Sequence, residues 1–449
     1  MNPSPGTPSV TSVAAGSILA EISHPNEEQK RRTWTLNHAE WGGALTLDQY
    51  LEREPYLTTI PLARDGGMRH WILKTRTYKH AASHDFEVSV LASCESIRKR
   101  VLATAHLRGE GRGVTVREYK AYGIGSVFTD PRFRGRGYAG RLLAEVAKAL
   151  KGGVMDDVAC TALWSDIGKQ YYAKKGWAAF PSLHFEFSVV DAAAAAERPN
   201  PNGASEPVNP AAQKAEKEEQ ANGAEAEAEA GGVTAVPIEY DDLAALCERD
   251  EELLRAQLAR TAIATGHTCV AFVPDRDTMM WHYLRDEFIT TKIFESHPSS
   301  TPREAAVRGA IAGATHGRRV WALWSRSYGG AAGEDPARTV DKNTLYILRL
   351  VVELEGTKAD LADNDEEDED VVAAFAAVMR TALEEARAWH LGKIDMWNPS
   401  PMAKQLVERS GLRHRSVDRE KDSIPSMMWY GLEDIKDIEW VANEKYCWC

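Results

Sequence analysis

The residues with the clearest chemical potential lie in a glycine- and arginine-rich segment, PRFRGRGYAG at residues 131–140, directly before an amphipathic helical pattern. It alternates cations and glycines: Arg132, Arg134, Gly135, Arg136 and Gly137. The first backbone N–H groups of a helix lack internal partners and, with the positive end of the helix dipole, attract anions. Glycines let the backbone approach such an anion, and arginines add charge around it. The segment predicts a phosphate or diphosphate site.

Two common phosphate-binding motifs do not describe this loop. It lacks the G-x-x-x-x-G-K-[ST] of a P-loop and the G-x-G-x-x-G spacing of a dinucleotide fold. Arg134-x-x-Gly137-x-Ala139 follows an apolar strand pattern at 118–129 and precedes YAGRLL. This arrangement resembles the [QR]-x-x-G-x-[GA] acyl-CoA loop of the GCN5-related N-acetyltransferase (GNAT) superfamily. The resemblance implies that the loop holds acetyl-CoA.

The elements around the loop follow the order expected for such a domain. Apolar periodicity and turn signals predict a helical pattern at 37–54, followed by strands within 70–74, 88–105 and 118–129. After the loop they predict a helix that ends at Leu150, a strand at 158–164, a short helix at 166–176 and a closing strand at 183–190. Helix, antiparallel strands, then strand, loop and helix is also the GNAT order. We therefore expect a mixed-sheet α+β fold.

The second half of the chain repeats this order of elements. It predicts helices at 240–261, 280–288, 371–389 and 401–410, with strands at 269–273, 319–324, 344–355, 393–397 and 427–430. Where the first half has RFRGRG, the second has the acidic run DLADNDEEDED at 360–370. That run would repel a diphosphate. We expect two tandem GNAT-like domains, the second lacking an acetyl-CoA loop.

Length and composition set the expected boundaries. A chain of 449 residues is too long for one ordinary domain. Residues 1–17 are rich in Pro, Ser, Thr and Gly and read as a disordered tail, and residues 191–232 read as a flexible, acidic Ala/Glu-rich linker. The expected catalytic domain is 18–190, and the degenerate GNAT-like domain is 233–449.

Charge, hydropathy and cysteine usage exclude several classes. A net charge of −12 argues against a general nucleic-acid binder. No stretch approaches the roughly 18 apolar residues of a membrane span, and the N-terminus lacks targeting features, which favours a cytoplasmic protein. Six cysteines without a C-x-x-C pair indicate neither a zinc site nor a disulfide framework, so we expect no metal. The terminal Cys447-Trp448-Cys449 reads as a packed or frayed tail rather than a redox site.

The resemblance also implies roles for individual residues. In GNAT enzymes a backbone N–H on the strand before the loop polarises the thioester carbonyl, here near Val127–Thr129. The expected cofactor-binding residues are Val127, Phe128, Thr129, Arg134, Gly135, Arg136, Gly137, Tyr138 and Ala139. Tyr172 matches the family's Y-x-x-x-G-[FY], with Trp177 at the last position, and would protonate the departing thiolate. Tyr171 would point about 100° away on a helix and is the weaker choice.

The general base is not evident from the sequence. Many GNAT enzymes carry a glutamate on the strand before the loop, where this chain has Tyr122-Gly123-Ile124. An amine with an unperturbed pKa near 10.4 must still lose its proton. We expect a relay through water or a carboxylate from elsewhere. Asp166 is a candidate for this catalytic role, with capping of the following helix as the alternative reading.

Four longer motifs resemble one branch of the superfamily. They are GIGSVFTDPRFRGRGYA, LWSDIGKQYYAKKGW, VAFVPDRDTMMWHYLRDEF and DMWNPSP. Together they look like the fungal lysine N6-acetyltransferases that act on free L-lysine at the start of its catabolism. The resemblance covers the chain apart from the tail and linker, and it implies an L-lysine acceptor. The candidate substrate residues are Asp395, Trp397 and Asn398, or else these form a packed strand end and turn.

Two other functions remain open at this point. Polyamines or protein lysines would suit an open acidic groove, whereas a pocket closed by the second domain would exclude a peptide. A CoA-binding module without catalysis would explain the missing glutamate. The sequence does not indicate an oligomeric state.

Overall fold

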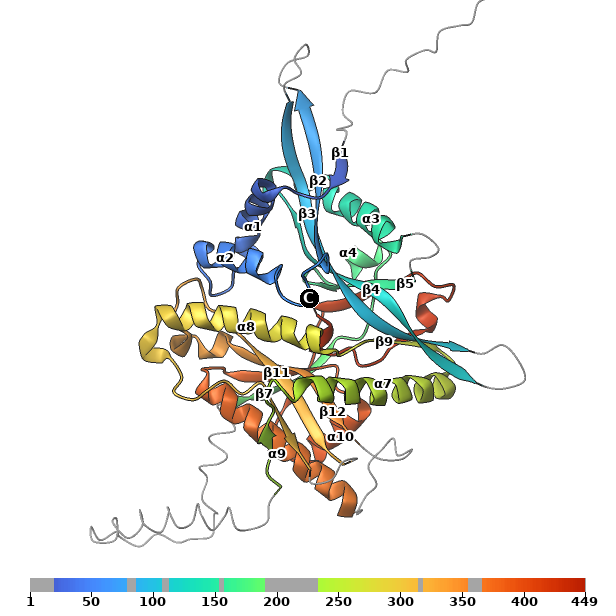
Figure 1. Ribbon diagram of the computed structural model, residues 1–449, viewed down its shortest axis with the longest axis vertical. Helices are drawn as coiled ribbons and strands as arrows, with labels where there is room; N and C mark the ends of the chain where they lie inside the picture. The colour runs from blue at the N-terminus through green and yellow to red at the C-terminus, as the bar shows by residue number, and fades with distance from the viewer. Residues whose placement is uncertain are drawn as a thin grey trace, which may run out of the picture.

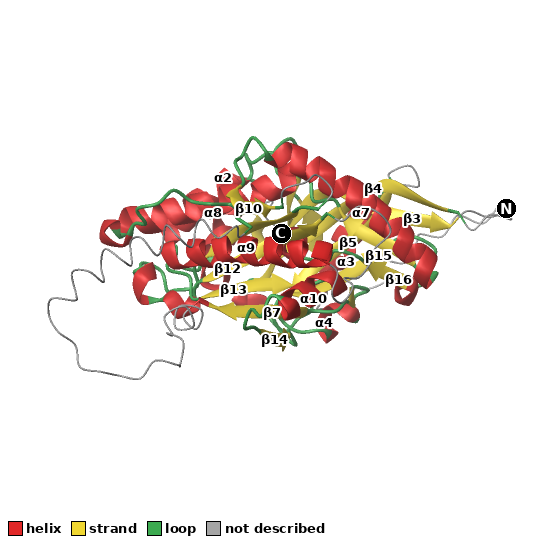
Figure 2. Cartoon of the chain, turned by 90° about the horizontal axis from the view of Figure 1, so that it is seen from below, coloured by secondary structure: helices red, strands yellow, loops and turns green. Residues whose placement is uncertain are grey.

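The computed structural model describes residues 20–78, 86–106, 113–152, 157–189, 233–313, 318–353 and 366–448. The predicted tail at 1–17 and linker at 191–232 lie outside these residues, as does most of the acidic run at 360–370. Two mixed sheets form the centres of two modules, and helices pack against both (Figures 1 and 2). The fold is therefore α+β with mixed sheets, as predicted.

The first sheet is built mainly from the N-terminal half. Its first strands are β1 (Ala20–Ser23), β2 (Met68–Tyr78), β3 (Phe86–His106), β4 (Val114–Thr129) and β5 (Val158–Ser165). They pair in chain order, antiparallel except for the parallel β4–β5 pair. The long β3 and β4 extend from the upper module toward its side (Figure 1). The predicted strands in this half are confirmed, with β3 and β4 longer than expected.

The helices of this half differ from the prediction at one place. The single helical pattern expected at 37–54 is wrong, because α1 (Glu27–Trp41) and α2 (Leu47–Leu57) are separate helices. Gly42 ends α1, and Thr46 begins α2 with a capping box to Gln49. Next comes α3 (Tyr138–Lys151), whose apolar face is buried against the sheet through Leu142, Leu143, Val146 and Leu150. The glycine-arginine loop is therefore held at the start of a firmly packed helix.

The second sheet has the order β14-β7-β13-β12-β11-β10-β8. Its strands are β7 (Leu183–Ser188), β8 (Val236–Pro237), β10 (Gly309–Ala312), β11 (Val320–Ser327), β12 (Thr344–Val352), β13 (Lys393–Trp397) and β14 (Arg415–Asp418). Among the strand pairs of this sheet that the structure describes, only β12–β13 is parallel. The long helix α9 (Glu366–Ala388) packs on this sheet through buried residues such as Phe375 and Met379.

Strands cross between the two modules, which the sequence did not predict. The expected closing strand of the first domain, β7, lies in the second sheet between β13 and β14. In return, β15 (Ile424–Trp429) pairs with β5 and with β6 (Ala178–Ala179) in the first sheet. Alternating apolar residues indicate a half-buried strand but not the sheet that it joins. The boundary expected around 190–233 therefore divides the chain without separating the two sheets.

Further elements close the junction. The remaining helices are α4 (Gln170–Ala173), α7 (Leu243–Thr265), α8 (Arg276–Ser296) and α10 (Pro401–Arg409). Strand β9 (Thr268–Phe272) pairs with β3 and with β16 (Ile438–Trp440) in the first sheet. Short 3-10 turns are η1 (Pro131–Phe133), η2 (Pro298–Ser300), η3 (Pro336–Arg338), η4 (Val340–Lys342), η5 (Ile435–Asp437) and η6 (Lys445–Cys447). In η6, the carbonyl of Cys447 accepts a 2.8 Å hydrogen bond from Lys99 Nζ of β3. The C-terminal segment thus packs at the centre of the molecule, as Figure 1 shows.

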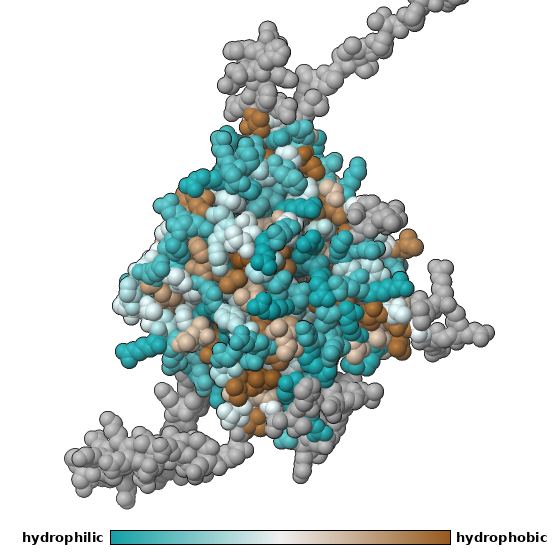
Figure 3. Space-filling model, viewed as in Figure 1, coloured by the Kyte–Doolittle hydropathy of each residue, from teal (hydrophilic) through white to brown (hydrophobic). Residues whose placement is uncertain are grey.

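The surface view shows hydrophilic residues over most of one face, with apolar residues in small separate groups (Figure 3). Among the helices that the structure describes, none combines the length and apolar character needed to cross a lipid bilayer. The five described cysteines are Cys94, Cys160, Cys247, Cys269 and Cys447, and all are buried free thiols.

Candidate active site

The loop before α3 has the geometry of an anion cradle. Gly135 and Gly137 have φ of 76° and 78°, a left-handed conformation that favours glycine. A Cβ added at either would meet no atom within 4 Å, so the backbone faces open space. Gly137 is the N-cap of α3 and has no side chain to accept from the first N–H groups of the helix. Those groups remain available to a diphosphate, so the predicted loop suits acetyl-CoA.

The three arginines of the loop have different surroundings. Arg132 is held by the carboxylate of Asp130, with a closest distance of 2.7 Å, and this pair lowers the pKa of Asp130. Arg134 donates from Nε to the carbonyl oxygen of Thr129 at 3.3 Å, and its guanidinium lies 5.1 Å from the ring centre of Phe128. Arg134 and Arg136 are exposed. They are the two cations of the loop that are best placed to meet a phosphate.

A bulge in β4 lies just beyond the point where its pairing with β5 ends. The two strands pair in parallel only where Lys120–Ile124 face Val158–Leu163, and β4 diverges beyond Ile124. The β3–β4 register shifts between Ser93 and Glu95, which face Phe128 and Gly125. Ser126 and Val127 thus oppose a single β3 residue, and Ser126 has a φ of +52°. The backbone N–H of Val127 lies in this irregular stretch, where the resemblance places the group that polarises the thioester.

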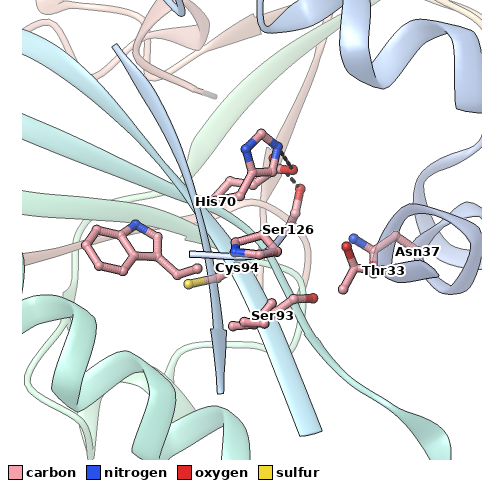
Figure 4. A pocket seen from close by; sticks show the side chains of 10 residues that line it. Thr33, Asn37, His70, Ser93, Cys94 and Ser126 are labelled. Atoms are coloured by element: carbon pink, nitrogen blue, oxygen red, sulfur yellow. Dashed lines mark hydrogen bonds and ion pairs between the residues drawn. The ribbon is translucent and has the colours of Figure 1, made fainter. Parts of the chain in front are cut away.

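Sequence reasoning missed the residues that brace this bulge. Ser126 donates from Oγ to Oε2 of Glu95 at 3.0 Å, and Nε2 of His70 lies 3.2 Å from Oε1 of the same carboxylate (Figure 4). Burial alone would raise the pKa of Glu95, but the contacts with His70 and Ser126 hold that pKa below its usual range. A cavity of about 10 Å³ beside them, also lined by Asn37 and Thr33, has room for about one water molecule. No motif marks Glu95, because its partners come from other strands.

Tyr172 is buried on α4 beneath α3. It packs in the cluster that contains Leu142, Leu163 and Trp177, and burial raises the pKa of its phenol above the usual value. A neutral phenol is the form that can donate a proton. Tyr171 is only partly buried and contacts the Tyr172 ring edge-on, with centroids 5.1 Å apart. These positions are compatible with the role that the resemblance implies for Tyr172.

Asp166 does not cap a helix. The expected helix from Asp166 is wrong, because α4 begins only at Gln170 and follows Lys169. Instead, Oδ1 of Asp166 accepts a hydrogen bond of 3.0 Å from the backbone N–H of Ser423. Asp166 as a whole is exposed, but partial burial of its carboxyl group raises the pKa of that group, and the Ser423 contact partly opposes the rise. A raised pKa makes a carboxylate a better proton acceptor.

A pocket of about 500 Å³ lies where the exchanged strands meet. Asp395 and Trp397, two of the predicted substrate residues, line it from the end of β13. The third, Asn398, does not line it, because Nδ2 of Asn398 is turned to donate to the carbonyl of Asn443 at 2.5 Å. The other wall residues include His184, Tyr346, Arg419 and Ser423. His184 and Arg419 were missed, since β7 had been expected in the other sheet.

Potential metal-ligand atoms also cluster at this pocket. Those of His184, Glu186 and Asp395 lie within 4.8 Å of one another. The ammonium of Lys393 lies 3.0 Å from Glu186 and 3.3 Å from Asp395. Lys393 therefore already balances the two carboxylates, and a divalent cation would have to compete with its charge. This arrangement suits a polar organic ligand better than a metal.

A bulged strand that leads into a glycine-arginine turn at a helix N-terminus defines an acyl-CoA-dependent transferase. Residues 213–449, more than half of the chain, match the family described as the LYC1 GNAT-like C-terminal domain. The chain belongs to this family, and its second module is GNAT-like, as predicted. It is also 25% identical to a protein of Yarrowia lipolytica named lysine acetyltransferase, over 96% of this chain and 100% of that one. The protein is an acetyl-CoA-dependent N-acetyltransferase of the GNAT kind.

The chain is also similar to solved structures at low sequence identity. A GCN5-related N-acetyltransferase from Kribbella flavida is 13% identical, with a TM-score of 0.45, covering 92% of this chain and 72% of that one. A tandem GNAT protein from the clavulanic acid biosynthesis pathway is 12% identical, with a TM-score of 0.41, covering 92% of this chain and 100% of that one.

Proposed function

We propose that the protein transfers an acetyl group from acetyl-CoA to the ε-amine of free L-lysine, by direct attack in a ternary complex. The observation that carries this proposal is the pocket on the second sheet, whose wall residue Ser423 is hydrogen-bonded to Asp166 at the end of β5. The name of the Yarrowia relative supports the choice of lysine. As the sequence and its resemblance to lysine N6-acetyltransferases led us to expect, we also propose a cytoplasmic enzyme that acts at the start of lysine degradation.

The residues of the first module would hold the acetyl donor. We assign the diphosphate to Arg134, Gly135, Arg136, Gly137 and the first turn of α3 at Tyr138 and Ala139. Acetyl-CoA supplies the activated thioester. The backbone along Val127–Thr129 would lie beside that group, and the N–H of Val127 would stabilise negative charge on its carbonyl oxygen.

Asp166 and Tyr172 would move the protons. A lysine ammonium must lose two protons as its nitrogen forms the amide bond and the C–S bond breaks. We propose that Asp166 accepts a proton from the ammonium, directly or through water, and passes it to solvent. Tyr172 donates a proton to the departing thiolate and is restored by the second proton. This assignment uses the charged form of Asp166 and the neutral form of Tyr172.

The second module would supply the acceptor pocket and no second CoA site. In the sequence, an acidic run replaces the glycine-arginine loop before α9. We therefore propose two modules, at 18–190 and 233–449, which share strands and hold one acetyl-CoA. The lining residues of the pocket lie on strands of the second sheet and on the segment 417–423. We propose that this enclosure suits a small amine better than a peptide.

A panel of amines tests the proposed function. The full chain is incubated with acetyl-CoA and, separately, L-lysine, L-ornithine, spermidine or a lysine-containing peptide, while thiol release is followed. We expect turnover to be fastest with free lysine. Release that is no faster with lysine than without an amine would overturn the proposal, and faster release with the peptide would favour a protein substrate.

A further inference from the structure

The pocket on the second sheet contains buried polar groups that lack hydrogen-bond partners. Arg419 is 8% exposed, His184 is 7% exposed and Asp395 is 4% exposed. The atoms without a hydrogen bond are Nε and both Nη of Arg419, both ring nitrogens of His184, and Oδ1 of Asp395. All three residues line the same cavity of about 500 Å³. Buried polar groups are nearly always paired, so this set points to a ligand that supplies the missing partners.

Arg419 requires an anionic partner in this pocket. Its guanidinium lies 4.0 Å from the centre of a Trp397 ring, which fixes its plane without satisfying its N–H groups. Burial lowers the pKa of Arg419 to about 10, so the group is still charged at neutral pH. A carboxylate matches a guanidinium with two parallel hydrogen bonds. The Arg419 side of the pocket is therefore suited to a carboxylate.

Asp395 and His184 provide the complementary side. Asp395 forms an ion pair with Lys393 at 3.3 Å through Oδ2, while its Oδ1 lies 4.0 Å from Nε2 of His184 without a hydrogen bond. Burial, with the positive charge of Arg419 and Lys393, lowers the pKa of His184 to about 4, so the ring is neutral at pH 7. A neutral imidazole and a free carboxylate oxygen both accept hydrogen bonds from an ammonium.

We propose that this pocket binds the α-carboxylate and α-ammonium groups of a free amino acid, the carboxylate on Arg419 and the ammonium on Asp395 Oδ1 and His184. The inference rests on the proposed function and deepens it by naming what the acceptor must carry. Ser423, another wall residue, contacts Asp166, so a side chain that extends past Ser423 approaches the end of β5. The pocket thus selects a free amino acid and leaves its far end for acetylation.

Ligands that carry only part of lysine test this site separately from turnover. L-Norleucine has both α-groups but no ε-amine, and 1,5-diaminopentane has the amines but no carboxylate. Binding of each to the full chain without acetyl-CoA is measured by isothermal titration calorimetry. We expect L-norleucine to bind within about tenfold of L-lysine and 1,5-diaminopentane to bind at least about tenfold more weakly. Absence of L-norleucine binding, or tighter binding of 1,5-diaminopentane, would overturn the inference.

A matched pair of variants locates the carboxylate. Arg419→Gln should weaken L-norleucine binding at least about tenfold, whereas Arg413→Gln, at an exposed position of the same segment, should leave it unchanged. Equal binding by Arg419→Gln and the unaltered protein would contradict the assignment. If Arg419→Gln does not fold, the ligand series with the unaltered protein still decides the question. Lysine turnover without L-norleucine binding would contradict only this inference. L-Norleucine binding without lysine turnover would contradict only the proposed function.

Discussion

The backbone N–H of Ser423 donates a hydrogen bond of 3.0 Å to Oδ1 of Asp166, joining residues 257 positions apart in the chain. Ser423 directly precedes β15, whose first residue, Ile424, faces Ser165 of β5. The segment that lines the proposed acceptor pocket is therefore attached to β5, which pairs with the strand that leads into the glycine-arginine loop. This contact is a consequence of the strand exchange, and it couples the two halves of the candidate active site.

Tyr172→Phe tests proton donation to the thiolate. The substitution keeps the ring that packs under α3 and removes only the hydroxyl. We expect kcat to fall by about 10²-fold, because proton transfer by a positioned side chain contributes on this scale. Acetyl-CoA affinity, measured by calorimetry, should stay unchanged. An unaltered kcat would remove Tyr172 from the mechanism.

Asp166→Asn tests the base through pH dependence. In the proposed mechanism Asp166 acts in its charged form, and partial burial of its carboxyl group raises its pKa above the ordinary Asp value near 4. The kcat/KM for lysine should fall as pH is lowered through that raised pKa. In Asp166→Asn we expect kcat/KM to be reduced by about 10²-fold and to show no such fall in this acidic range. If kcat/KM of the variant still falls in the same acidic range, another group titrates there.

Replacing Arg134 and Arg136 together by Ala tests the anion cradle. Both guanidinium groups are exposed at the loop and have room to meet a diphosphate. We expect the acetyl-CoA dissociation constant to rise by about 10- to 100-fold, since hydrogen bonds between charged groups are lost. Lys148→Ala, an exposed position in the last turn of α3, is the matched control and should bind normally. Equal affinities in both variants would contradict the cradle.

The bulge in β4 depends on an unusual backbone at Ser126. Its φ of +52° is costly for residues other than glycine, and its hydroxyl is bound to Glu95. Ser126→Val, which adds a β-branch and removes the hydroxyl, should lower the free energy of unfolding by about 1–3 kcal/mol. Ser126→Gly should cost less, because glycine adopts this φ freely. Urea unfolding measures both, and equal stability of the two variants would argue against backbone strain.

Shared strands predict that neither module folds alone. Without β15, the core of the first module loses Met427, which is fully buried, and β5 loses one of its two partner strands. Fragments 20–189 and 233–448 should each lack a cooperative thermal transition by circular dichroism. Mixing them should restore one. A sharp transition in an isolated fragment would show that the exchange is dispensable.

Local features of the chain were predictable from sequence. The glycine-arginine loop, strands β2 to β5 and helices α3 and α9 follow from periodicity and turn residues that act over a few positions. The division between α1 and α2 was missed, although Gly42 and the Thr46 capping box mark it. That signal was present and was outweighed by the continuous helical pattern around it.

Features that depend on long-range pairing were not predictable. The sheet that receives β7 is decided by its partners on β13 and β14, more than 200 residues away. This pairing brings His184 to Asp395 and places Arg419 over Trp397. Likewise, Glu95 could not be recognised from sequence, because its contacts are with Ser126 and His70 on neighbouring strands. Asp395 and Trp397 were predicted only because a motif contains them.

Acetylation of free lysine at its far nitrogen is tested by the identity of the product. The full chain is given L-lysine and acetyl-CoA that carries a ¹³C-labelled acetyl carbonyl, and the product is analysed by NMR. We predict a single labelled product, N6-acetyl-L-lysine, formed at a rate that falls in Tyr172→Phe. Label on the α-nitrogen, or no labelled lysine product while CoA is released, would contradict the account.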